Sequence, residues 1–300
     1  MSLDPLVQRL LDRTAAFGLA PFAEVGAVAA REQTELVAGI RRRRAVLPEL
    51  ASYEHGTVAG RPAVTATPLG DGPFPVVLHL HGGGWVVGSL ASYEVDIRRL
   101  AADLGAVVVA LDYRLAPEHP WPAAVDDAWA ALLELTATHD RVAVAGDSAG
   151  GNLAAVCARR ARDAGIALSG QLLVYPATSQ ARHFPSYDEN GVGLLLDRDT
   201  MRFFSSCYLP PGADRTDPDL SPLEADDVAG VAPAVVTVAS HDPLRDEGLA
   251  YAERLRDASV AVTVVVADGQ VHGYEAFAPD IPGAERAVVA SRDAFRGLLS

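Results

Sequence analysis

The chain has 300 residues, of which 49% are hydrophobic and 21% charged, and its formal net charge is −14. This composition is that of a soluble globular protein of one or two domains with a sizeable core. The excess of acidic residues argues against nucleic acid or an anionic membrane surface as a partner.

The sequence also bears on where the protein works. No apolar stretch reaches the length of a membrane span, and residues 1–14 mix charges with leucines, unlike a signal peptide. The two cysteines, Cys157 and Cys207, are too few for a disulfide framework. We therefore expect a cytoplasmic protein that does not contact a membrane.

In chain order, residues 1–45 come first, and they have helical amphipathic spacing with Leu6, Val7, Leu10 and Leu11 on one face. From about Thr57, short apolar runs alternate with helical stretches. The runs predict strands at 76–80, 106–111, 141–145, 171–175, 234–239 and 261–266. The stretches between and after them predict helices at 122–139, 151–165, 244–259 and 283–299. This alternation predicts an α/β fold with a mostly parallel central sheet flanked by helices.

Two segments fall outside the alternation, residues 1–45 and about 182–226. The second is rich in proline, aspartate and aromatic residues. Ligands bind at the carboxyl edge of such sheets, and mobile segments often cover them there. We expect residues 46–300 to form the catalytic domain, with residues 1–45 and the 182–226 insertion forming a helical cap.

Residues 146–150, Gly-Asp-Ser-Ala-Gly, lie between a predicted strand and a predicted helix. A strand that turns sharply into a helix at G-x-S-x-G is a nucleophile elbow, in which the turn exposes the serine hydroxyl. Side chains at Gly146 and Gly150 would clash in so tight a turn, and the amides of the following helix point toward developing negative charge. By itself the motif also fits an ordinary glycine-rich turn. The flanking elements favour a nucleophilic Ser148.

A serine hydroxyl needs a base to take its proton and a carboxylate to orient that base. Of the eight histidines, His272 is the one in a loop after the last predicted strand. Asp242 follows the strand predicted at 234–239, whereas Asp246 and Glu247 fall one turn into the next helix, where they favour its dipole. We therefore predict a triad of Ser148, Asp242 and His272, in that chain order.

The third requirement is a set of donors for the oxyanion. Residues 81–85, His-Gly-Gly-Gly-Trp, follow the strand predicted at 76–80, and three glycines leave backbone N–H groups free to approach a substrate oxygen. A phosphate-binding loop is the alternative, but the Lys-Ser/Thr of a P-loop does not follow it, nor is a dinucleotide fingerprint present. The predicted donors are Gly83 and Gly84, with Ala149 as a third. Trp85 is a candidate pocket wall, with core packing an equal alternative.

Four motifs in this order resemble one family, the bacterial hormone-sensitive-lipase-like carboxylesterases of the α/β-hydrolase fold. They are His-Gly-Gly-Gly-Trp at 81–85, Asp-Tyr-Arg-Leu-Ala-Pro-Glu at 112–118, Gly-Asp-Ser-Ala-Gly-Gly-Asn at 146–152, and Asp-Pro-Leu-Arg-Asp-Glu-Gly at 242–248 followed by His272-Gly273. The resemblance implies a serine esterase for short- to medium-chain acyl esters that uses the triad and donors above. It also implies a cap made of the N-terminal helices and an insertion after the sixth strand, and it admits a homodimer.

The same resemblance gives expectations for residues outside the triad. Arg114 and Glu118 are expected to pair in a structural turn, and His81 to hold the glycine loop in shape. Gln270 and Tyr274 differ from the usual apolar residue and phenylalanine of the family. We expect them to alter the polarity of the pocket.

The hypothesis from sequence is a carboxylic ester hydrolase that needs no metal or cofactor and acts on a small-molecule ester. The same machinery also suits an amide, a formamide or a lactone. A non-catalytic receptor on a hydrolase scaffold is a further alternative, and the complete set of catalytic residues argues against it.

Overall fold

The computed structural model describes residues 2–300, and one sheet of eight strands runs through it in the order β1-β2-β4-β3-β5-β6-β7-β8. The strands β3 to β8 are parallel, and β1 and β2 are antiparallel at one edge. Their bounds are β1 Ser52–Val58, β2 Arg61–Thr67, β3 Val76–Leu80, β4 Val107–Leu111, β5 Val142–Asp147, β6 Gln171–Val174, β7 Ala234–His241 and β8 Val262–Val271.

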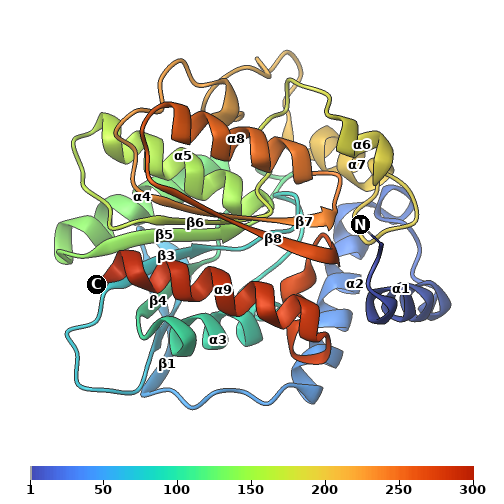
Figure 1. Cartoon of the computed structure of the whole chain (residues 1–300), viewed down its shortest axis with the longest axis horizontal. Helices are drawn as coiled ribbons and strands as arrows, with labels where there is room; N and C mark the ends of the chain where they lie inside the picture. The colour runs from blue at the N-terminus through green and yellow to red at the C-terminus, as the bar shows by residue number, and fades with distance from the viewer. Residues whose placement is uncertain (1) are drawn as a thin grey trace.

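Helices cover both faces of this sheet, with α4, α5 and α8 on one face and α3 and α9 on the other (Figure 1). The connections carry two short 3-10 helices, η1 and η2. The bounds are α1 Pro5–Phe17, α2 Phe22–Arg44, α3 Glu94–Leu104, α4 Ala123–Thr138, α5 Ala149–Asp163, α6 Pro185–Glu189, α7 Arg198–Tyr208, η1 Pro222–Glu224, α8 Arg245–Asp257, η2 Tyr274–Asp280 and α9 Pro282–Leu299.

The core consists of two apolar layers separated by the sheet. Successive side chains of a strand point to opposite faces, so Leu78 packs in the layer with Leu132 and Leu153, whereas Val77 packs in the layer with Phe295. Strands buried on both faces explain why β3 and β5 are almost continuously apolar. The prediction of a mostly parallel sheet flanked by helices is confirmed.

The sequence prediction missed three elements near the antiparallel edge. β1 is largely exposed and β2 half-buried, so neither shows the apolar run by which the other strands were found. The helix α3 buries Val95, Ile97 and Leu100 against the sheet, and its helical spacing was available to sequence reasoning. β1 and β2 close one edge of the sheet away from the predicted triad, whereas Tyr93, the residue before α3, lines the same pocket as Ser148.

Four helices gather at the side toward which β7 and β8 point, namely α1, α2, α6 and α7 (Figure 1). α2 contacts α7, which joins the N-terminal segment to the segment after β6. α2 bends at Gly26, where φ is 78°. No helix within residues 2–300 is both long enough and apolar enough to cross a membrane.

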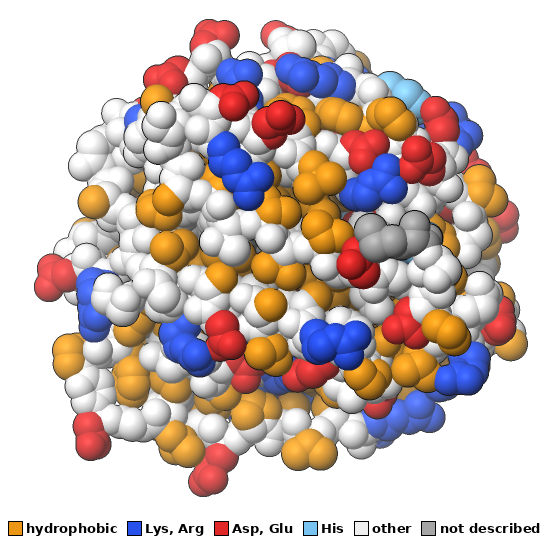
Figure 2. Space-filling model, viewed as in Figure 1, with side chains coloured by type: hydrophobic (Ala, Val, Ile, Leu, Met, Phe, Trp, Pro, Cys, Tyr) orange, Lys and Arg blue, Asp and Glu red, His pale blue; other side chains and the backbone are white. Residues whose placement is uncertain are grey.

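The space-filling view shows acidic and basic side chains interspersed over one face of the molecule, without a large patch of either sign (Figure 2). Charges of both signs spread in this way keep a surface well hydrated. This face therefore does not by itself indicate a charged binding surface.

Candidate active site

Ser148 stands between β5 and α5 in a backbone conformation that few residues adopt. Its φ is 55° and its ψ −116°, a strained combination for a side chain with a Cβ. Its amide donates to the Val174 carbonyl at 2.8 Å, which ties the turn to β6. The geometry is that of the predicted nucleophile elbow.

Close backbone contacts explain the glycines of the elbow. A Cβ on Gly146 would lie 2.2 Å from the Gly150 carbonyl oxygen, and one on Gly150 would lie 1.9 Å from the Leu80 carbonyl oxygen. Backbone atoms cannot move aside as a flexible side chain can, so any other residue would force the turn open. These glycines fix the position of Ser148 relative to β3.

The structure brings the three predicted triad residues into one hydrogen-bonded chain. His272 Nε2 lies 3.0 Å from Ser148 Oγ, and His272 Nδ1 lies 2.8 Å from Asp242 Oδ2. Asp242 is fully buried, and its other carboxylate oxygen accepts the Leu244 amide at 2.8 Å. Both carboxylate oxygens therefore have a partner, which holds the side chain in one orientation.

The two partners of His272 determine which nitrogen carries the proton. A carboxylate can only accept, so Nδ1–H donates to Asp242 and Nε2 is left to accept the Ser148 hydroxyl proton. The Tyr175 ring lies against the imidazole, with ring centroids 4.5 Å apart. This packing limits rotation of the imidazole and keeps Nε2 facing Ser148.

The glycine loop approaches Ser148 from β3. Gly83 and Gly84 have φ of 112° and 59°, and both line the same pocket as Ser148 and Ala149. The amide of Ala149 opens α5, and the first amides of a helix have no partner within it. The three residues predicted as oxyanion donors thus line the same pocket as Ser148.

Two side chains that sequence reasoning left without a role anchor this loop. Asp147 Oδ1 accepts the Gly82 amide at 2.8 Å, and the Tyr93 hydroxyl donates to Asp147 Oδ2 at 2.9 Å. The Gly82 amide also lies 3.0 Å from the Tyr93 hydroxyl. A Cβ on Gly82 would lie 2.3 Å from Asp147 Oδ2, so this contact requires glycine. Burial raises the pKa of Asp147 to about 7.

His81 has the structural role expected of it. Its Nδ1 donates to the Gly82 carbonyl at 2.7 Å, and its ring stacks on Tyr113, whose hydroxyl donates to the His81 carbonyl at 2.7 Å. Burial lowers the pKa of His81 to about 4, so the ring is neutral near pH 7. The histidine holds the first turn of the loop.

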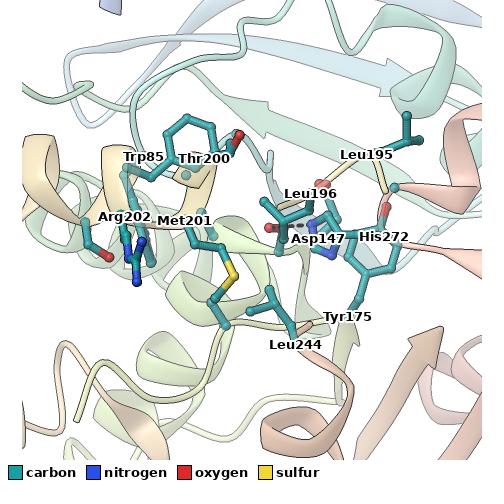
Figure 3. A pocket seen from close by; sticks show the side chains of 18 of the residues that line it. Trp85, Asp147, Tyr175, Leu195, Leu196, Thr200, Met201, Arg202, Leu244 and His272 are labelled. Atoms are coloured by element: carbon teal, nitrogen blue, oxygen red, sulfur yellow. Dashed lines mark hydrogen bonds between the residues drawn. The ribbon is translucent and has the colours of Figure 1, made fainter. Parts of the chain in front are cut away.

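A cavity of about 710 Å³ opens over Ser148 and His272. Leu196, Met201 and Leu244 project into it beside His272 (Figure 3). Its wall is shared by the sheet edge, the N-terminal segment and the segment after β6. Its apolar lining includes side chains from α2, α7 and the loop before α7, namely Phe22, Leu195, Leu196, Met201 and Phe204.

Trp85 satisfies both interpretations left open by the sequence. It lines the cavity, and it is also 3% exposed and stacked on Tyr208 of α7 with ring centroids 4.2 Å apart and planes at 4°. The stack joins the end of the glycine loop to α7.

Glu247 is a pocket residue that its sequence position did not reveal. It is fully buried, its Oε1 accepts the Thr178 amide at 2.5 Å, and Tyr187 of α6 donates to Oε2. Burial raises the pKa of Glu247 to about 8. Through Thr178 and Tyr187, Glu247 links α8 to the segment after β6. Its position one turn into a helix did not predict this contact.

The expected pair of Arg114 and Glu118 is not formed, so this expectation from the resemblance is wrong. Arg114 Nη2 instead lies 2.7 Å from the buried Asp127 on α4, and Glu118 pairs with Arg31 of α2 at 2.6 Å. The sequence could not show that α2 passes within reach of Glu118.

Gln270 and Tyr274 do not line the cavity, so they do not set its polarity. Both side chains are fully buried: Gln270 lies 3.3 Å from Asp4, and the Tyr274 hydroxyl donates to Thr237 at 3.1 Å. Tyr274 belongs to the apolar layer that contains Phe295.

Among residues 2–300, His, Cys, Asp and Glu side chains do not form a group of three or more that could hold a metal ion. The site offers a hydrogen-bonded serine, histidine and aspartate, with glycines and a helix N-terminus lining the same pocket.

Comparison with known proteins places this geometry in a family. A family model described as the alpha/beta hydrolase fold matches residues 77–276, which contain every predicted triad and oxyanion residue. The chain belongs to the bacterial hormone-sensitive-lipase-like carboxylesterase family of α/β hydrolases.

Named relatives are similar over most of their length. Carboxylesterase NlhH of Mycobacterium tuberculosis is 39% identical over 305 residues, covering 95% of this chain and 92% of the relative. Ethyl acetate hydrolase of Pseudomonas putida is 40% identical, covering 71% of this chain and 70% of the relative. The solved hyperthermophilic esterase of the archaeon Pyrobaculum calidifontis superimposes with a TM-score of 0.94 at 36% identity, covering 99% of each chain.

Proposed function

We propose that this protein is a serine carboxylesterase that hydrolyses short- to medium-chain acyl esters. The hydrogen-bonded chain from Asp242 through His272 to Ser148, open to a largely apolar cavity, carries the proposal. The names of its relatives, carboxylesterase and ethyl acetate hydrolase, support the reaction class. The cavity volume of about 710 Å³ suits a substrate of the size of a small ester.

In this mechanism Ser148 Oγ attacks the ester carbonyl while His272 Nε2 takes its proton. The carbonyl oxygen becomes an oxyanion that accepts hydrogen bonds from the amides of Gly83, Gly84 and Ala149, each contributing on the order of 3 kcal/mol to the transition state. His272 then gives its proton to the departing alcohol, leaving an acyl group on Ser148. A water deprotonated by His272 attacks the acyl-enzyme and releases the acid.

Asp242 stabilises the imidazolium that forms in each half of this cycle. Because the carboxylate is buried and held by the Leu244 amide, the attraction between the two charges acts with little screening by water. Asp242 also keeps the proton on Nδ1, which leaves Nε2 available as the base.

We also propose that residues 1–45 and about 182–226 act as the cap of the catalytic domain, 46–300. α1, α2, α6 and α7 belong to these segments, and Phe22, Met201 and Phe204 bring them to the cavity. A cytoplasmic location is consistent with Cys157 and Cys207 both being free thiols. A homodimer stays a prediction from the resemblance.

The experiment is hydrolysis of p-nitrophenyl esters from acetate to palmitate by the wild-type protein and by S148A. We expect activity to peak at short to medium chains and to fall by about a thousandfold or more in the variant. Turnover retained by S148A would refute the mechanism. If the folded wild-type protein cleaves amides or lactones but not esters, the proposed substrate class is wrong and the proposed triad still stands.

A further inference from the structure

Charge is distributed unevenly along the wall of the active-site cavity. The segment 182–226 contains nine acidic residues and four arginines. Within this segment, all of which the structure describes, the acidic side chains do not line the cavity, whereas the arginines all do. These are Arg182, Arg198, Arg202 and Arg215. A segment that is acidic overall thus turns its positive charge toward the substrate.

Two of these guanidinium groups have hydrogen-bonding capacity to spare. Arg215 is exposed, its Nη1 donates to the Gln180 carbonyl at 3.2 Å, and within residues 2–300 its charge has no carboxylate within 4.0 Å. Arg198 lines the cavity, and its ion pair with Asp188, at 3.4 Å, is longer than a charge-assisted hydrogen bond. A guanidinium has five N–H donors in a planar fork that matches a carboxylate.

The other two are held more closely by acidic neighbours outside the cavity wall. Arg182 lies 2.6 Å from Glu224, and Arg202 lies 3.1 Å from Asp199. Each of these two guanidinium groups has a hydrogen-bonded carboxylate partner, whereas Arg198 has only the longer pair with Asp188 and Arg215 has none among residues 2–300. Arg198 and Arg215 are therefore the groups best able to take up a further carboxylate.

The remaining acidic side chains on the wall are Asp147 and Glu247, and both are buried with their own hydrogen bonds. Burial raises the pKa of Asp147 to about 7 and that of Glu247 to about 8. At neutral pH they therefore carry less negative charge than exposed carboxyl groups do. Their electrostatic repulsion of an anionic ligand is therefore weaker than that of two fully ionised carboxylates.

One of these arginines, Arg202, stands apart from the reacting atoms. In Figure 3, Arg202 lies at the opposite side of the pocket from His272, with Met201 and Leu244 between them. A ligand that reaches both ends would place an apolar chain over these side chains and a charged end among the arginines. A chain with net charge −14 repels anions at long range, so binding one requires positive charge concentrated at the site.

We propose that the preferred substrates are esters with a free carboxylate at the far end of an apolar chain, bound through Arg198 and Arg215. This inference rests on the proposed esterase function. The chemistry is the same whether the carboxylate belongs to the acyl or the alcohol portion of the ester, and the experiment distinguishes the two.

The test compares matched charged and neutral esters. For the acyl side the pair is mono-p-nitrophenyl suberate and p-nitrophenyl octanoate. For the alcohol side it is 4-carboxyphenyl butanoate and 4-carbamoylphenyl butanoate. We expect kcat/KM for the charged member of one pair to equal or exceed that of its neutral partner. We expect this charged-to-neutral ratio to fall roughly fivefold in R198Q or R215Q, since losing one such pair is equivalent to about 1 kcal/mol.

Two control variants bear on the interpretation. R256Q removes an exposed arginine that does not line the cavity, and we expect it to leave both ratios unchanged. R215K keeps the charge but loses the planar fork, so the ratio should lie between those of the wild type and R215Q. Raising the salt concentration should lower the ratio in the wild type more than in R215Q. Ratios that are the same in wild type, R198Q and R215Q for both pairs would overturn the proposal.

A measurement without turnover separates this proposal from the esterase function. Binding of monomethyl suberate to the S148A protein, followed by calorimetry, should weaken when R215Q is added. If no ester is hydrolysed but this binding and its loss are seen, the esterase function fails while the carboxylate site stands. If esters are hydrolysed and S148A binds monomethyl suberate no better than S148A/R215Q, the carboxylate site fails alone.

Discussion

Asp147 Oδ1 accepts a hydrogen bond from the Gly82 amide, with the two atoms 2.8 Å apart. The residue that precedes the proposed nucleophile thereby fixes the loop that carries the proposed oxyanion donors. Tyr93 completes the link through its hydroxyl, which contacts both groups. Ser148 and the Gly83 and Gly84 amides are therefore positioned by one connected set of contacts.

Removing the Tyr93 hydroxyl tests this link. In Y93F the Gly82 amide keeps Asp147 but loses its second partner, so the loop is held less firmly. We expect kcat to fall by about tenfold with little change in KM, since a misplaced oxyanion donor weakens the transition state more than substrate binding. Steady-state kinetics on p-nitrophenyl butanoate provide the measurement. An unchanged kcat would show that Asp147 alone holds the loop.

The buried Glu247 gives the protein a specific dependence of stability on pH. Because the pKa of Glu247 is raised by burial to about 8 from an ordinary 4.5, the folded protein keeps a proton that the unfolded chain has already released between these values. The free energy of unfolding therefore falls as pH rises through this window. In E247Q the contribution is absent, so the fall should be shallower.

Urea unfolding at about pH 5.5 and about pH 8.5 measures this difference. Asp147 also lowers the free energy of unfolding as pH rises to about 7, and it does so in both proteins. The difference between the two proteins in this loss of stability is therefore due to Glu247. Equal losses of stability in wild type and E247Q would contradict the assignment.

Gly84 and Phe204 should be energetically coupled. A Cβ on Gly84 would lie 2.1 Å from Phe204 Cγ, and the φ of 59° adds strain for any other residue. We expect G84A to lower stability and kcat/KM, and F204A to recover part of that loss in the double variant. A double-mutant cycle of thermal unfolding and kinetics tests the coupling. If the effects of G84A and F204A are strictly additive, the glycine loop, and not Phe204, accommodates the added methyl group.

We predict that Tyr208 stabilises the protein through its ring stack on Trp85 and not through its hydroxyl. That hydroxyl is buried without a hydrogen-bond partner among the described residues. We expect Y208F to be as stable as wild type or more so, because an unsatisfied polar group is removed. Y208A should lose about 3–5 kcal/mol of unfolding free energy through the cavity left beneath Trp85. Urea titration of both variants gives the comparison, and a large loss in Y208F would reveal a partner such as water.

The sequence was sufficient for the parallel sheet and the positions of Ser148, Asp242 and His272. Buried strands can be recognised as continuous apolar runs. Each triad residue follows one of these strands in the sequence, so finding the strand also located the residue. β1 was missed because its side chains are mostly exposed, so its position depends on pairing with β2 rather than on its own pattern.

Contacts between segments distant in sequence could not be predicted in the same way. Arg31 reaches Glu118, Tyr93 reaches Asp147 and Tyr187 reaches Glu247, across 87, 54 and 60 positions respectively. Each depends on how segments far apart in the sequence pack together, which no local pattern specifies. The gathering of the arginines of residues 182–226 on the cavity wall is of the same kind, since it depends on the path of that segment.

Covalent labelling tests the central role of Ser148 most directly. The protein is incubated with diethyl p-nitrophenyl phosphate, which transfers a phosphoryl group to an activated serine, and its intact mass and peptide masses are measured. We expect one diethylphosphoryl group per chain, located on the peptide that contains Ser148, with loss of ester hydrolysis in proportion to labelling. S148A and H272A should remain unlabelled. Labelling at another residue that abolishes hydrolysis, or full hydrolysis by a protein labelled at Ser148, would contradict the account.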